Sequence, residues 1–289
     1  MEASGEVPRL SNQELFELLK GSAPFIHRHS AVIIVEGDRT FSGVYAKFHG
    51  YYGILTAGHC AKDFMSGERF GLVVSESMHQ FWADPASFEH ITIGDDENGD
   101  YSLDGPDLSF ALIKDHRLLA ALFAKDIKFY EILFDNVNRI DFRNIDTRSW
   151  CVSGNPKENV AVSFGLLNGN AAKMVNTTAA VIQGFFQNYE EKGGHDYISL
   201  SIGSAFEEFP VDYDGVSGGG IWYQKLVLFE KKTLAIEPVL AGITCWQSAP
   251  TDQQGWTIRR ITGHCITSVY GHMRRLLREK WTLEQQSRG

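Results

Sequence analysis

The sequence predicts an all-β fold with a helix at each end. From Ala31 onward, short apolar runs alternate with Gly, Asp and Asn, a spacing that is typical of antiparallel strands joined by turns. Few helical stretches separate these runs, which favours a sandwich or barrel over an α/β fold. The chain of 289 residues is long enough for one large domain or two small ones.

The predicted strands are short and rich in β-branched and aromatic residues. They are AVIIVEG, TFSGVYAKF, YYGILTAGH, FGLVVSE, SFALIK, WCVSG, NVAVSFG, TAAVIQGFF, YISLSIG, GGIWYQ, LAIEPVLAGIT and WTIRRI. Two segments break this pattern. Polar and acidic residues over 85–106 predict an exposed loop, and helical spacing over 115–128 predicts a connecting helix.

Helix signals stand at both ends of the chain. Ser11 followed by Glu14 is a capping box ahead of an apolar pattern, and this helix is expected to end at Gly21. After Ile266, apolar and basic residues recur at helical spacing and predict an amphipathic helix. The predicted organisation is an N-terminal helical extension (1–27), a first β unit (28–130), a second β unit (131–265), and a C-terminal helix and tail (266–289).

The charge balance argues against two classes of partner. The formal net charge is -9, whereas proteins that bind nucleic acid or anionic membranes need a basic surface. We therefore expect neither nucleic acid nor membrane as a partner. The first residues lack a secretory signal pattern, and no run approaches the ~20 apolar residues that span a bilayer. A cytoplasmic location is the expectation.

The cysteines give no sign of a metal site or a disulfide framework. Cys60, Cys151, Cys245 and Cys265 form no CxxC pair, and no Cys/His cluster has the spacing of zinc ligands. We expect them to be small, mostly buried thiols, and we expect no metal and no cofactor.

Two motifs of the first β unit each contain a polar residue next to an apolar strand. In ILTAGHC (54–60), small residues before His59 leave room for a substrate or nucleophile to approach the imidazole. In PDLSFALI (106–113), Asp107 opens an apolar run, so its carboxylate should lie at the core edge and accept strong hydrogen bonds. Taken alone, a structural histidine and a strand-edge aspartate remain alternatives.

The third motif is the glycine-rich segment DGVSGGGIW (214–222). Its glycines permit a tight turn whose backbone N–H groups point inward and leave the Ser217 hydroxyl exposed. A plain glycine-rich hairpin turn remains an alternative for the motif alone. A phosphate-binding loop is disfavoured, because no lysine follows and no strand–helix unit surrounds the motif. The order of the three candidates is His, Asp, Ser, as in chymotrypsin-type enzymes.

Four motifs together resemble those of the trypsin-like (chymotrypsin-fold) serine peptidases. LTAGHC resembles the family's T-A-A-H-C, DLSFALI resembles D-I-A-L-L, GVSGGGIW resembles G-D-S-G-G-P, and LAGITCWQS (240–248) resembles the strand that ends in S-W-G. The resemblance covers roughly residues 28–285. It implies two perpendicular six-stranded antiparallel β-barrels with the active site in the cleft between them, flanked here by an N-terminal and a C-terminal helix.

The resemblance implies a catalytic triad. Ser217 would attack the scissile carbonyl, His59 would act as general base and then acid, and Asp107 would orient His59. The backbone N–H groups of Gly215 and Ser217 would bind the oxyanion.

The resemblance also implies a substrate groove. An extended substrate would pair with the strand residues Thr244, Cys245, Trp246 and Gln247. At the base of the specificity pocket the chain has Val211 followed by Asp212, so basic and small apolar specificity both remain open. Gln247 replaces the glycine usual at the pocket mouth and could narrow it.

Departures from the family pattern concern disulfides and activation. The region that should carry the disulfide partner of Cys60 reads FSGVY (41–45), so the resemblance is to intracellular, bacterial-type members. Val216 stands where secreted zymogens carry the aspartate that pairs with a new N-terminal amine. We therefore expect that cleavage near the N-terminus does not switch the enzyme on.

The function expected from the sequence is that of a serine endopeptidase. It would hydrolyse peptide bonds in a protein or peptide substrate through an acyl-enzyme intermediate, with narrow specificity or with activation by a protein partner. Two alternatives remain: a trypsin-like binding module or scaffold without activity, and an esterase or other acyl hydrolase that uses the same triad.

Overall fold

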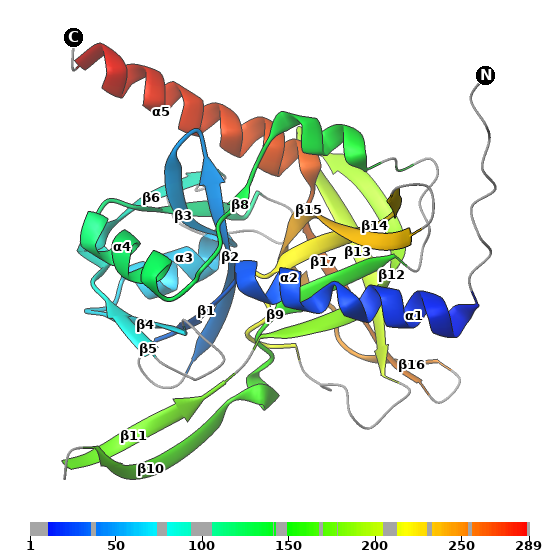
Figure 1. The fold of residues 1–289 in the computed structure, drawn as a ribbon, viewed down its shortest axis with the longest axis horizontal. Coiled ribbons are helices and arrows are strands. Elements are labelled where there is room, and N and C mark those ends of the chain that lie inside the picture. The colour runs from blue at the N-terminus through cyan, green and yellow to red at the C-terminus, as the bar shows by residue number, and fades with distance from the viewer. Residues whose placement is uncertain are drawn as a thin grey trace.

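The computed structural model of the chain is mostly β, with two sheets and helices packed against them (Figure 1). It describes residues 11–35, 39–73, 80–93, 106–140, 142, 149–167, 170–177, 179–204, 213–229, 233–253 and 256–287. The first sheet contains strands between Ser30 and Glu131, and the second contains strands between Trp150 and His264. The predicted mostly-β fold with a helix at each end is confirmed at this level.

The first sheet has eight strands among the described residues, in the order β5-β4-β1-β2-β3-β7-β6, with β8 beside β2. They are β1 (Ser30–Ile34), β2 (Thr40–Phe48), β3 (Tyr51–Thr56), β4 (Phe70–Val73), β5 (Gln80–Ala83), β6 (Phe88–Ile93), β7 (Leu108–Ile113) and β8 (Tyr130–Glu131). The hairpin between β2 and β3 turns at His49 and Gly50, both with positive φ, as a tight two-residue turn requires.

The predicted exposed loop over 85–106 is wrong for residues 88–93, which form β6. This strand pairs with β7 along its whole length. The β-branched residues Ile91 and Thr92 suit a strand, and pairing with a buried neighbour outweighs the polar residues around them. Residues 94–105 of the predicted loop lie outside the described residues.

The second sheet has seven strands in the described part of the chain, in the order β13-β12-β9-β14-β15-β17-β16. They are β9 (Trp150–Gly154), β12 (Ala180–Lys192), β13 (His195–Ser204), β14 (Gly220–Phe229), β15 (Thr233–Gln247), β16 (Thr251–Gln253) and β17 (Trp256–His264). β13 also pairs with β17, so this sheet curls round until those two strands meet.

The expected pair of six-stranded barrels is not confirmed. The first sheet has more strands than expected, and its outer strands β5 and β6 do not pair with each other within the described ranges. Strands β10 (Ala161–Leu167) and β11 (Asn170–Asn176) form a separate hairpin that pairs with neither sheet there and projects away from both (Figure 1).

Helices connect and flank the two sheets. The α-helices are α1 (Asn12–Gly21), α2 (Ala23–His29), α3 (Gly58–Met65), α4 (His116–Ala124) and α5 (Arg274–Ser287), and the 3-10 turns are η2 (Pro85–Ser87), η3 (Phe134–Arg139) and η4 (Lys157–Asn159). A π-helical segment, η5 (Thr267–Met273), runs into α5. The predicted connecting helix is confirmed as α4, and the predicted capping box at Ser11 and Glu14 is present. No helix among the described residues is long and apolar enough to cross a membrane.

The N-terminal helices are part of the packed body. Gln224 of β14 is fully buried, and its Nε2 donates to the Leu19 carbonyl (2.9 Å) and to Ser22 Oγ (2.6 Å). These acceptors lie at the end of α1, where helix carbonyls lack intrahelical partners. The second sheet therefore holds α1 in place, and the boundary expected at residue 27 falls inside α2.

The hydrophobic core joins the two sheets. One buried cluster contains side chains of both, among them Phe48 and Leu108 of the first sheet and Trp222 and Ile243 of the second. Because the sheets share this core, the end of β3 and the start of β7 are held against the turn that precedes β14. The predicted site residues His59, Asp107 and Ser217 lie at these three places.

Candidate active site

His59 and Asp107 meet because β3 and β7 are antiparallel neighbours. Thr56 lies opposite Ser109, so residues just after β3 face residues just before β7. His59 occupies the first turn of α3, and Asp107 immediately precedes β7. The Asp107 side chain is only 1% exposed, whereas that of His59 is 37% exposed and reaches the surface.

The Asp107 carboxylate binds His59 through both of its oxygens. Oδ2 lies 2.6 Å from the imidazole Nδ1, and Oδ1 accepts the backbone N–H of His59 at 2.8 Å. A carboxylate at Nδ1 fixes the tautomer in which Nδ1 carries the proton, so Nε2 is the acceptor. This arrangement gives the imidazole both its orientation and its basicity.

The main chain of Asp107 is held from the second sheet. Its N–H donates to Nε2 of His264 (2.7 Å), and the Cys245 thiol donates to its carbonyl (3.3 Å). Burial lowers the pKa of His264 to about 4, so this imidazole is neutral at pH 7. Cys245 was predicted to contribute to the substrate groove. It is buried, and its thiol supports the main chain of Asp107.

A buried network extends this support. Nδ1 of His264 lies 3.2 Å from Ser268 Oγ, which donates to the Asp196 carboxylate at 2.7 Å. Asp196 also accepts the backbone N–H groups of Thr267 and Ser268, both at 2.7 Å. These side chains are buried, so the start of β7 is fixed to the end of β17 by bonds shielded from water.

The Cys60 thiol lies between His59 and Ser217. Its Sγ is 3.2 Å from Nε2 of His59 and 3.4 Å from the Ser217 carbonyl. Burial pushes the pKa of His59 down, whereas Cys60 and Asp107 push it up, to about 11 overall. Burial also raises the pKa of Cys60, which keeps the thiol neutral at pH 7. Because the Cys60 thiol is neutral at pH 7, the charge that raises the pKa of His59 at this pH is that of the Asp107 carboxylate.

The turn that carries Ser217 requires glycine at two positions. Gly215 and Gly218 have φ values of 89° and 86°, in the left-handed region that side chains disfavour. A Cβ on Gly218 would also overlap Thr56 Oγ1 and the Ser42 carbonyl. The glycine run therefore lets the turn approach the first sheet closely.

Ser42 of β2 holds this turn at two carbonyls. Its Oγ donates to the Gly215 carbonyl (2.6 Å), and its N–H donates to the Ser217 carbonyl (3.1 Å). The same Oγ accepts the N–H of Asn155 at 2.8 Å. Ser42 is buried, so one side chain ties the nucleophile turn to both sheets.

The two remaining carbonyls of the turn are also held. Lys157 N–H donates to the Asp214 carbonyl (2.7 Å), and Thr244 Oγ1 donates to the Val216 carbonyl (2.7 Å). A peptide is planar, so fixing these carbonyls aims the N–H groups of Gly215 and Ser217 the opposite way. Within the described ranges, neither of these N–H groups has an acceptor. Both predicted oxyanion donors thus point away from the held carbonyls.

The predicted substrate strand contains both free and occupied groups. β14 pairs with β15 only as far as Gly220 opposite Ile243, so from Thr244 to Gln247 β15 has β17 on one side and no other described strand. The Ser217 hydroxyl donates to the Cys245 carbonyl on this stretch (3.2 Å). Trp246 stacks on Tyr197, with ring centroids 5.8 Å apart. Val211 and Asp212 lie outside the described residues.

No local pattern in the sequence indicates a role for Ser42, Lys157 or His264. A serine within a strand and a histidine at a strand end are common, and nothing in the local pattern indicates a contact more than a hundred residues away.

No group of three or more His, Cys, Asp or Glu side chains with metal-binding geometry occurs in the described part of the chain. All four cysteines are free and buried.

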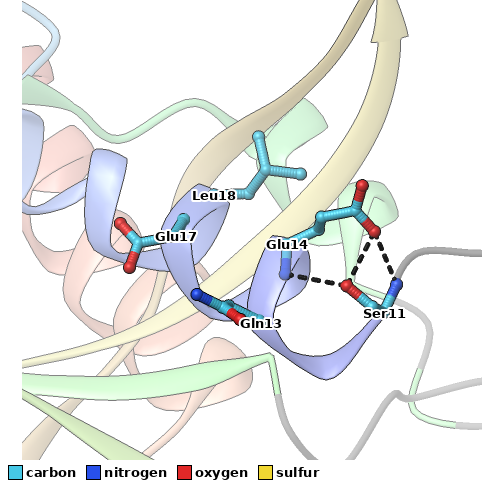
Figure 2. Close-up of a pocket in the computed structure, with 5 residues that line it drawn as sticks. All are labelled: Ser11, Gln13, Glu14, Glu17 and Leu18. Atoms are coloured by element: carbon cyan, nitrogen blue, oxygen red, sulfur yellow. Dashed lines mark hydrogen bonds between the residues drawn. The ribbon is translucent and has the colours of Figure 1, made fainter.

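A surface hollow lies on α1, away from the elements that carry His59, Asp107 and Ser217. Ser11, Gln13, Glu14, Glu17 and Leu18 line it (Figure 2). Its Ser11 and Glu14 side chains bond each other and the helix backbone, so these groups serve the helix cap.

Comparisons with known proteins were made for sequence and for structure. The sequence matches no protein-family model and no curated protein. The solved structures that resemble the chain include "a thermostable serine protease AL20 from extremophilic microoganism" (14% identity, TM-score 0.42, 83% of this chain and 91% of that chain). They also include protease Anisep from Arthrobacter nicotinovorans (12%, TM-score 0.41, 85% and 94%). A third is the HtrA-type protease AlgW with tripeptide (13%, TM-score 0.43, 88% and 64%). These neighbours are proteases, but likeness at this level carries no argument about activity, which is therefore inferred from the geometry alone.

Proposed function

We propose that the chain is a serine endopeptidase whose triad is Ser217, His59 and Asp107. One observation carries the proposal: a buried carboxylate orients an imidazole beside a serine turn whose Gly215 and Ser217 N–H groups have no acceptor among the described residues. The Cys60 thiol contacts both the imidazole and the Ser217 carbonyl, and this shared contact supports the pairing of His59 with Ser217.

The reaction proceeds through an acyl-enzyme. Nε2 of His59 takes the Ser217 hydroxyl proton as the oxygen attacks the scissile carbonyl, and the Asp107 carboxylate stabilises the imidazolium that forms. The two free N–H groups bind the oxyanion, and each such donor is worth ~10²–10³ in rate. The imidazolium then protonates the leaving amine. In the second half of the reaction, His59 takes a proton from water, which attacks the acyl-enzyme and releases the carboxylic acid of the cleaved peptide.

The exposed stretch of β15 supports a peptide as the substrate. After Thr244, which bonds the Ser217 turn through Gly218 and Gly219, β15 pairs with β17 and with no other described strand, and this stretch begins next to Ser217. An extended peptide can add there as a further strand, so main-chain hydrogen bonds supply affinity. A small ester would make no use of this edge.

The test combines covalent labelling with cleavage. A fluorophosphonate probe should label the wild-type protein and fail to label Ser217→Ala, and a peptide library should be cleaved by the wild-type protein alone. Asp107→Asn should lower kcat by about 10⁴ through the wrong imidazole tautomer. Ser66→Ala is the matched control, because Ser66 is an exposed serine bonded only locally, to the Asp63 carbonyl. Cleavage that survives in Ser217→Ala would overturn the proposal.

A further inference from the structure

The side chain of Gln247 crosses the space next to the proposed scissile bond. Its Oε1 accepts the N–H of Tyr213 (3.2 Å), and its Nε2 donates to Asp214 Oδ1 (2.7 Å). Two residues earlier on the same strand, the Cys245 carbonyl contacts Ser217 Oγ. Gln247 thus connects β15 to the segment that leads into the Ser217 turn.

Two hydrogen-bond donors around Gln247 lack an acceptor. Arg259 of β17 places Nη1 3.4 Å from Gln247 Oε1, while its Nε is shielded from solvent and has no hydrogen-bond partner in the described part of the chain. The Tyr213 hydroxyl is shielded and unpartnered in the same way, on a side chain that is only 3% exposed. Unpaired buried polar groups are costly, so two of them on residues that contact Gln247 point to a binding site for an acceptor.

The local charges favour an anionic group. Burial raises the pKa of Tyr213 to about 12, although the charge of Arg259 lowers it, so the hydroxyl stays protonated at neutral pH and can donate. Asp214 and Glu158 lie nearby, but both are exposed and solvent screens their charges. Arg259 is half-buried with a shielded Nε, so its charge acts more strongly at this position.

We propose that Arg259, Tyr213 and Gln247 form the subsite for the side chain whose carbonyl Ser217 attacks, and that this side chain is acidic. The inference rests on the proposed function, because it requires a peptide at Ser217. The Gln247 carboxamide oxygen accepts bonds from Tyr213 N–H and Arg259 that a substrate carboxylate can accept more strongly. When the Gln247 side chain rotates away, Tyr213 N–H and Arg259 donate to the substrate carboxylate instead. A basic side chain is repelled by Arg259.

The test is a set of peptides that differ only at the attacked residue, carrying Glu, Gln, Ala or Lys, compared by kcat/KM. The Glu peptide should exceed the Gln peptide by about tenfold or more, and the Lys peptide should be the poorest. Arg259→Gln should bring the Glu-to-Gln ratio near one, and Arg259→Glu should favour Lys over Glu. Arg260→Gln is the matched control, because Arg260 is the exposed next residue of β17, and it should leave the ratio unchanged.

The outcomes separate the subsite from the activity. A wild-type preference for Lys or Ala, or a Glu-to-Gln ratio that Arg259→Gln leaves unchanged, overturns the acidic subsite while Ser217-dependent cleavage upholds the peptidase. Absence of both cleavage and fluorophosphonate labelling overturns both. Labelling also reports whether the Arg259 variants fold. If they do not, Tyr213→Phe, which removes only the hydroxyl, should lower the same ratio several-fold, and an unchanged ratio there overturns the subsite.

Discussion

The thiol of Cys60 lies 3.2 Å from Nε2 of His59, the nitrogen that must accept the Ser217 proton in the proposed mechanism. The same thiol lies 3.4 Å from the Ser217 carbonyl, and its single proton can serve only one of the two acceptors. Cys60 therefore competes with the Ser217 hydroxyl for the catalytic nitrogen. The sequence does not predict this competition, because side chains of adjacent helix residues such as His59 and Cys60 normally do not face each other.

The first prediction concerns the pH profile. His59 must be neutral to act as base, and its pKa is raised above the usual 6.5. The midpoint of the rising limb of activity should therefore lie above pH 6.5. Cys60 occupies Nε2 of His59, the nitrogen that must accept the Ser217 proton, so Cys60→Ala should free this nitrogen and increase kcat/KM at neutral pH. The measurement is kcat/KM against pH for both proteins. Superimposable profiles would show that the thiol does not affect the imidazole.

The second prediction concerns Ser42. Ser42→Ala leaves the Gly215 carbonyl and the Asn155 N–H without their shared partner. A loosened turn misplaces the oxyanion donors, so kcat should fall by on the order of 10². Stability should fall by about 1–3 kcal/mol, the usual cost of unpaired buried groups.

The control for this prediction is Ser30→Ala. Ser30 is also buried and bonds a backbone carbonyl, that of Ile26, but at the junction of α2 and β1. It should lose stability while keeping kcat. Equal loss of kcat in the two variants would mean that Ser42 acts on the fold in general and has no specific effect on the turn.

The third prediction concerns His264 and acid stability. Burial lowers the pKa of His264 from 6.5 to about 4, so between these values the unfolded chain binds a proton that the folded chain does not. The free energy of unfolding should therefore fall as pH decreases from about 6.5 to 4, by about 3 kcal/mol from this group. Nearby Asp107 and Asp196 favour the charged form and His195 opposes it, and these contributions are already included in the shift.

Urea unfolding at pH 7 and pH 4.5 measures this effect. His264→Gln keeps an acceptor for the Asp107 N–H but cannot titrate, so its stability should change less between the two pH values than that of the wild type. A variant with the same pH dependence as the wild type would assign the acid sensitivity to other groups.

The fourth prediction concerns the N-terminal helices. A chain trimmed to about residue 25 loses Leu19 and Ser22, the acceptors of the buried Gln224 amide. It should be less stable and should gain no activity, because the carbonyls of the nucleophile turn are already held by Ser42, Lys157 and Thr244. Thermal unfolding and peptide cleavage measure the two effects.

Gln224→Leu in the trimmed chain should restore part of the stability, since no buried amide is then left unpaired. Activity that appears on trimming, and disappears when the new amine is blocked, would contradict this account.

The residue sequence by itself determined the identity of the candidate groups. Alternating apolar runs predicted the strands, and the glycine run predicted a tight turn at Ser217, because these features depend on local backbone preferences. The Ser11–Glu14 capping box was predictable for the same reason. Local polarity misled at residues 88–93, where pairing with β7 decided the outcome.

Only the tertiary structure decided how the candidate site is supported. Ser42 holds the turn at Gly215 from a strand more than a hundred residues away in sequence, and His264 holds Asp107 across a similar separation. Arg259 meets Gln247 through strand register, which a single sequence does not specify. Side chains that act on local backbone leave a pattern in sequence. Side chains that act across sheets leave none, because any strand position can face a distant partner and only the shared core fixes which partner that is.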